Sequence, residues 1–137
     1  MRRILGTALG TIAALALLIA VETLAHWLYP APLGFDTVNR AELAAAMAAV
    51  PLPAKLLVAF GWFAAAFGGA WLALRVCDGR WAGWLVALLV VAGNIVNFAA
   101  LPHPLWMQAL GVLLPLLGGA LAQRAHRKPY KGEPLLG

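Results

Sequence analysis

The sequence predicts an all-α fold: a bundle of four transmembrane helices, with a short extracytoplasmic helix between the first and second spans. Its 137 residues are 64% hydrophobic and only 11% charged, whereas soluble domains carry about 25% charged residues. The charges are also clustered, which leaves four apolar runs of the length, about 18 residues or more, that crosses a bilayer. These runs are residues 4–28, 54–76, 81–100 and 105–122. They occupy most of residues 1–137, so we interpret the chain as a single integral membrane domain.

The first span follows a basic start, Met1-Arg2-Arg3, that resembles the beginning of a secretory signal. The apolar region of a signal has about 7–15 residues. Here the uncharged stretch runs for 18 residues, from Ile4 to Val21, and no convincing A-x-A cleavage site follows it. We therefore expect a retained signal anchor.

The outer turns are marked by proline pairs, "PAP" at 30–32, "PLP" at 51–53 and "PHP" at 102–104. Proline stops a helix and is welcome in the first helical turn. Between the first two pairs, Asn39 and Glu42 resemble a capping box before an alanine-rich segment. We predict a short helix over about residues 40–49, too short to span. We expect it to lie on the outer surface of the bundle, or in the membrane interface, as a lid.

Small residues at intervals of four predict close packing of the spans. Lipid tails are as apolar as leucine, so close backbone contact and hydrogen bonds must hold helices together in a bilayer. Gly6 and Gly10 form one such pair, and Gly61, Ala65 and Gly69 form a second series. The fourth span contains Pro115, which suggests a kink. Packing within the chain is favoured, although the same motifs also fit self-association.

Charge asymmetry predicts the topology, because cytoplasmic loops of membrane proteins are rich in Lys and Arg. Eight basic residues fall on one side of the four spans: Arg2, Arg3, Arg75, Arg80, Arg124, Arg127, Lys128 and Lys131. The other side has only Arg40 and Lys55. Both termini should be cytoplasmic. This bias also accounts for the net charge of +5 without nucleic acid, and the basic tail, residues 123–137, should attract anionic lipid headgroups.

A few polar residues lie within the spans, toward the outer side. Glu22 and His26 share a face of the first span, and Asn94 and Asn97 share a face of the third. Glu22 and Asn94 each precede an outer proline by eight residues, which places them about 12 Å below the outer turn. If these spans are neighbours, the four residues and His103 form a polar intramembrane site beneath the lid.

A carboxylate that faces lipid is costly, so we expect Glu22 to point into the bundle. Asn94 and Asn97 can donate hydrogen bonds to it, and Lys55 could reach it from the start of the second span. Three interpretations are open: a structural polar network, a proton- or solute-binding site, or a metal site made by Glu22, His26 and His103. The structural network is favoured, and we expect no metal and no cofactor.

No catalytic motif is apparent. The chain lacks G-x-S-x-G, HExxH and Walker sequences, and it contains no serine. Cys77 is the lone cysteine, which excludes an internal disulfide and a CxxC pair. An enzyme would have to use Glu22 and His26 as an acid–base pair on a lipid-borne substrate. We therefore expect a protein that is not an enzyme.

The stretches "HWLYPAPLGFD" and "NIVNFAALPHPLW", with the first-span glutamate and "PLP", resemble a group of small, uncharacterised bacterial four-span membrane proteins. The resemblance implies the fold and a place in the bacterial cytoplasmic (inner) membrane, but no activity. The small multidrug-resistance transporters also have four spans and a first-span glutamate. This chain departs from them because Glu22 lies in the outer part of its span and because its charge bias is strong.

These observations favour a non-enzymatic structural or accessory subunit of the inner membrane. It would bind partners through its helix faces or its outer lid, either another membrane protein or further copies of itself. The alternative is a small proton-coupled transporter or solute-binding protein that uses Glu22.

Overall fold

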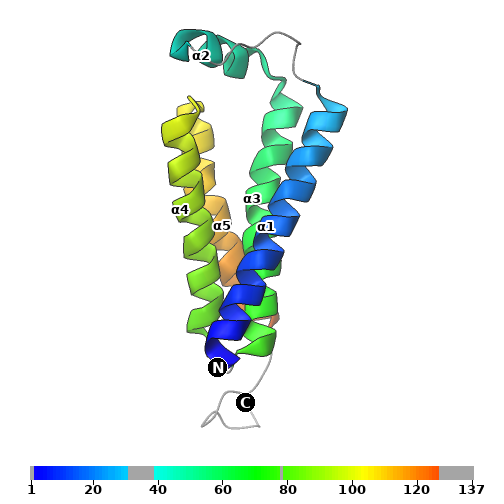
Figure 1. Ribbon diagram of the computed structural model, residues 1–137, viewed down its shortest axis with the longest axis vertical. Coiled ribbons are helices and arrows are strands. Elements are labelled where there is room, and N and C mark those ends of the chain that lie inside the picture. The colour runs from blue at the N-terminus through cyan, green and yellow to red at the C-terminus, as the bar shows by residue number, and fades with distance from the viewer. Residues whose placement is uncertain (1, 31–38, 78, 127–137) are drawn as a thin grey trace.

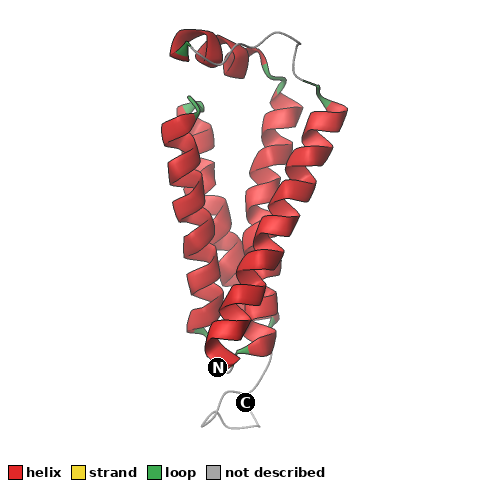
Figure 2. Ribbon diagram, viewed as in Figure 1, coloured by secondary structure: helices red, strands yellow, loops and turns green. Residues whose placement is uncertain are grey.

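The computed structural model describes residues 2–30, 39–77 and 79–126, which form a purely helical arrangement (Figure 2). The helices are α1 (Arg2–Leu28), α2 (Arg40–Ala49), α3 (Leu52–Val76), α4 (Trp81–Ala100) and α5 (Leu105–Ala125). Among the residues described, four helices are long and apolar enough to cross a membrane, namely α1, α3, α4 and α5. The predicted all-α fold and its four candidate spans are confirmed at this level.

α3 and α5 both extend beyond the apolar runs from which their boundaries were predicted. α3 begins at Leu52, with Pro53 in its first turn, where the missing proline N–H needs no intrahelical acceptor. α5 continues to Ala125 through the polar residues Gln123 and Arg124. The apolar run ends at Ala122, but glutamine and arginine are good helix formers, so the helix continues.

The four long helices alternate in direction, so α1 begins and α5 ends at the same end of the bundle (Figure 1). α3 is the central helix and packs against α1, α4 and α5. In the described part of the chain, α1 and α5 do not pack against each other. Toward the end that carries α2, the α1–α3 pair diverges from the α4–α5 pair (Figure 1).

Glycine allows the closest helix contacts, and these contacts lie within the chain. At the α1–α3 crossing, a Cβ added to Gly10 would lie 2.6 Å from the Gly69 carbonyl oxygen and 2.7 Å from the Ala73 Cβ. Between α5 and α3, a Cβ on Gly118 would lie 2.8 Å from the carbonyl oxygen of Phe63. Backbones that approach this closely gain the packing contacts that hold membrane helices together.

α2 occupies the predicted residues but does not seal the bundle. Its Asn39 cap accepts a hydrogen bond from the Ala41 N–H at 3.0 Å, and Lys55 Nζ donates to the Ala48 carbonyl near its other end at 3.2 Å. No residue of α2 is buried, and no other described helix packs against it. Its expected place, on the outer surface of the bundle or in the membrane interface, stays a prediction.

Candidate binding cavity between α1 and α4

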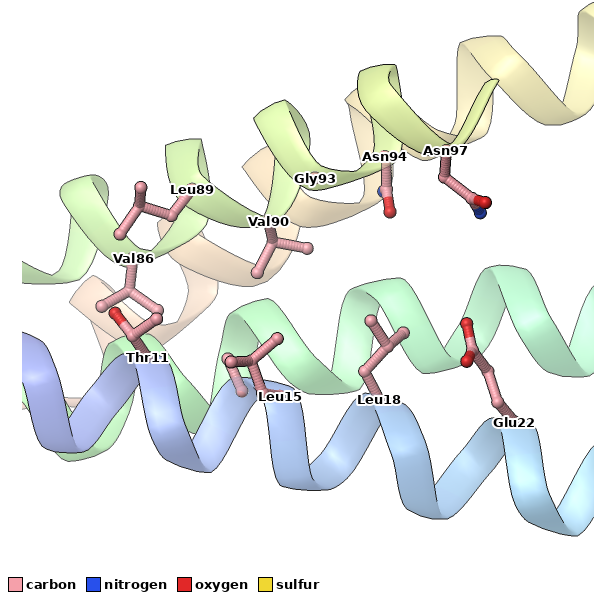
Figure 3. Close-up of a pocket in the computed structure, with 11 residues that line it drawn as sticks. Thr11, Leu15, Leu18, Glu22, Val86, Leu89, Val90, Gly93, Asn94 and Asn97 are labelled. Carbon is pink, nitrogen blue, oxygen red and sulfur yellow. The ribbon is translucent and has the colours of Figure 1, made fainter. Parts of the chain in front are cut away.

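A cavity of about 310 Å³ lies between α1 and α4 (Figure 3). Near the start of the bundle these helices are joined through a buried cluster that includes Ala14, Ala73 and Val86. Beyond that cluster they separate, and the cavity occupies the space between them. Its walls are Thr11, Ala14, Leu15, Leu18 and Glu22 of α1 and Val86, Leu89, Val90, Gly93, Asn94 and Asn97 of α4.

Most of the cavity is lined by apolar side chains, and one end is polar. Leucine, valine and alanine side chains form the walls through its middle. Glu22, Asn94 and Asn97 gather at one end of the cavity (Figure 3), toward the ends of α1 and α4. Thr11 lies at the other end, where its hydroxyl donates to the Thr7 carbonyl of its own helix at 2.9 Å. The cavity therefore has the polarity of an amphiphilic molecule, with its carboxylate and amide groups at one end and a single hydroxyl, bonded to its own helix, at the other.

Glu22 projects from α1 across the cavity toward Asn94 and Asn97 (Figure 3). Its side chain is exposed. Within the described part of the chain, it has no hydrogen-bond or ionic partner. A carboxylate at membrane depth is expensive unless it is paired or faces a polar cavity. The described chain therefore leaves Glu22 unpaired but directed toward the cavity.

Asn94 is 3% exposed and does not donate to Glu22. Its Nδ2 donates to the Gly111 carbonyl of α5 at 2.8 Å. Pro115 is the reason: it lies four residues after Gly111 within α5, and proline lacks the N–H that would bond to that carbonyl. Asn94 of α4 thus donates a hydrogen bond to a carbonyl of α5 that has no partner within α5. Its side-chain oxygen points into the cavity (Figure 3).

His103 lies outside the cavity, in the turn between α4 and α5, and is 8% exposed. Its ring packs against Phe98 with centroids 5.2 Å apart and against Trp62 at 6.2 Å. Its Nδ1 donates to the Leu101 carbonyl at 3.0 Å, and its own carbonyl accepts from Gln108 Nε2 at 2.8 Å. These contacts give His103 a structural role in the turn.

The structure also separates His26 and Lys55 from the cavity. His26 is exposed on α1 and does not line it. Lys55 reaches Ala48 of α2 rather than Glu22. Among the described residues, no three or more His, Cys, Asp or Glu side chains lie close enough to hold a metal ion. The metal interpretation of Glu22, His26 and His103 therefore has no set of ligands to rest on.

Gly93 is a cavity residue that the sequence pattern did not single out. A Cβ built on it would meet no atom within 4 Å, in contrast to Gly10, Gly69 and Gly118 at helix contacts. Its signal in the sequence was a glycine inside an apolar run, one residue before Asn94. Glycine within a helix costs about 0.5–1 kcal/mol relative to alanine, so a glycine without a packing reason indicates a need for space.

Comparisons of this chain with protein-family models, with curated proteins and with solved structures found no match. Function is therefore inferred from the cavity and its residues.

Proposed function

We propose that this protein is a non-enzymatic integral membrane protein that binds a small amphiphilic molecule in the α1–α4 cavity. The observation that carries the proposal is the cavity itself, with an apolar length and with Glu22, Asn94 and Asn97 at one end. Ligand sites have volumes of about 300–1,000 Å³ and are mostly apolar with a few converging polar groups. This cavity fits that description at the small end of the range.

Glu22 and Gly93 support binding over a purely structural polar network. Asn94 has a structural role, since its amide donates to the Gly111 carbonyl. Glu22 has no such partner in the described chain, and a network would have paired it. Gly93 supports the same conclusion, because it lines the cavity and a Cβ added to it would meet no atom within 4 Å.

The proposed location is the bacterial cytoplasmic membrane, with both termini in the cytoplasm. Arg75, Arg80 and Arg124 lie at the ends of α3, α4 and α5 that share one side of the bundle. Arg75 is placed over the Trp71 ring, 4.3 Å from its centroid, as expected near an interface. The polar end of the cavity then lies in the outer half of the bilayer, on the side of α2.

Filling the cavity tests the proposal. Gly93→Phe adds a large side chain on the cavity wall, at a position where a Cβ would meet no atom within 4 Å. Val96→Phe is the matched control, because Val96 is on the same helix, 70% exposed and outside the cavity. The protein is purified in native lipid nanodiscs, and small molecules are extracted and identified by mass spectrometry. We expect one compound in near-stoichiometric amount with the unmodified protein and Val96→Phe, and at least a tenfold loss with Gly93→Phe.

Equal recovery from all three proteins would contradict cavity binding. A protein that co-purifies instead of a small molecule would support the second proposal, an accessory subunit. The observation that favours this second proposal is α1, the least buried of the four long helices. Its exposed apolar side chains include Leu5, Ile12 and Ile19, which recur every seven residues and form a face on which another span could pack.

A further inference from the structure

The polar end of the cavity is unusual because two acceptor groups face into it. Glu22 contributes a carboxylate, which in its ionised form only accepts hydrogen bonds. Asn94 contributes its side-chain oxygen, since its amide nitrogen is held by the Gly111 carbonyl. Pro115 frees that carbonyl and therefore fixes which end of the Asn94 amide faces the cavity. Two acceptors across a cavity call for a donor between them.

We propose, on the basis of the binding function proposed above, that the cavity binds a single-chain primary amine in its ammonium form. An ammonium carries three N–H donors and a positive charge. One N–H can bond to Glu22 and another to the Asn94 oxygen, while Asn97 lies beside them at the same end. The bound ammonium also neutralises the carboxylate, which removes the cost of an unpaired charge at membrane depth.

The apolar part of the cavity selects the rest of the ligand. Leu15, Leu18 and Val90 form its walls between the polar end and Thr11. From Glu22 to Thr11 the helix rises by about 16 Å, so the space is elongated along α1. An alkyl chain can occupy this space and contact the apolar side chains that line it.

Anionic amphiphiles and phospholipids fit less well. The described residues that line the cavity include no Lys or Arg, so a carboxylate or phosphate headgroup would lie beside Glu22 without compensation. A phospholipid also has two chains, and the cavity of about 310 Å³ is at the small end of the usual range for ligand pockets. These observations favour a free amine over the ethanolamine headgroup of a membrane lipid.

The test uses decylamine as the probe, with decanol, decanoate and the trimethylated decylammonium ion as chain-matched comparisons. Binding is measured by native mass spectrometry and by thermal stabilisation of the protein in phosphatidylcholine nanodiscs. We expect decylamine to bind at least about tenfold more tightly than the trimethylated ion, because the latter has the charge but no N–H donor. This comparison needs no variant, so it does not depend on the folding of a mutant.

Two charge-neutralising variants localise the effect. Glu22→Gln should weaken decylamine binding about tenfold or more while leaving decanol binding unchanged, since the cavity keeps its shape. Glu42→Gln makes the same chemical change on the exposed face of α2, outside the cavity, and should change neither. Decanol binding also reports that the Glu22→Gln bundle is folded.

The possible failures are distinguishable. If decylamine, decanol and the trimethylated ion bind equally, and Gly93→Phe abolishes all three, the primary-amine proposal is overturned and cavity binding stands. If nanodiscs rich in phosphatidylethanolamine compete with decylamine, the site belongs to a lipid headgroup and the single-chain proposal is overturned. If no probe binds in a Gly93-dependent way and no compound is extracted from the protein, both proposals are overturned.

Discussion

At the scale of single residues, the hydrogen bond between Asn94 and Gly111 should be coupled to Pro115. Asn94→Leu leaves the buried Gly111 carbonyl without a donor, and hydrogen bonds between membrane helices contribute about 0.6–1.7 kcal/mol. In a Pro115→Ala background, residue 115 regains an N–H that can satisfy this carbonyl. We therefore expect Asn94→Leu to destabilise the natural chain by about 1 kcal/mol more than the Pro115→Ala chain. Thermal or steric-trapping unfolding in detergent measures the cycle. Asn97→Leu is the control, and an equal cost of Asn94→Leu in both backgrounds would contradict the coupling.

The sequence predicted part of the candidate site because helical periodicity depends only on the chain. Glu22, Asn94 and Asn97 were expected on facing sides of two spans, and the structure places all three around one cavity. The partner of Asn94 was not predicted. The position of Pro115 is enough to predict that the Gly111 carbonyl, four residues earlier, has no partner within its helix. Which side chain reaches that carbonyl depends on which helices are neighbours, and the sequence does not show this. His103 was misplaced for the same reason: its aromatic neighbour Trp62 comes from α3, and nothing in the local sequence indicates that contact.

At the scale of helices, the same substitution should have opposite effects at two glycines. Gly10→Ala places a Cβ 2.6 Å from the Gly69 carbonyl oxygen, so α1 and α3 must move apart, and overpacking of this kind costs about 1–3 kcal/mol. Gly93→Ala meets no atom within 4 Å, and replacing a helical glycine gains about 0.5–1 kcal/mol. We expect a lower unfolding temperature for the first and a higher one for the second. Destabilisation by both would show that the wall of the cavity at Gly93 is closed in the membrane.

The helices themselves could be predicted because each is determined by local properties. Apolar length defines the spans, and the Asn39 cap defines the start of α2. The end of α5 was missed because hydropathy falls at Gln123 although helix formation continues. The surroundings of α2 were less clear in the sequence, because its apolar residues fit the outer surface of the bundle as well as a membrane interface. In the described chain no other helix packs against it, so its place stays a prediction.

At the scale of the whole molecule, chain order alone did not predict the arrangement of the spans. α3 is central although it is the second span, and α1 is held mainly by α3. The small residues on α3 make this possible, since Gly61, Ala65 and Gly69 present a surface that α1 can approach closely. α4 has weaker support from α1, and the two helices diverge to form the cavity. The cavity thus follows from an uneven distribution of close contacts across the bundle.

The orientation of the whole bundle can be tested through the lone cysteine. Cys77→Ala removes the only thiol, and single cysteines are then introduced as Ala45→Cys in α2 and Ala125→Cys at the end of α5. Among the described residues, Arg2, Arg3, Arg75, Arg80 and Arg124 belong to the end of the bundle at which α5 ends, and only Arg40 and Lys55 belong to the other end. The positive-inside rule assigns the first of these ends to the cytoplasm. A membrane-impermeant maleimide should therefore label Ala45→Cys in intact spheroplasts and Ala125→Cys only after lysis. The reverse pattern would place Glu22 in the cytoplasmic half of the bilayer, and any amine would then have to enter the cavity from inside the cell.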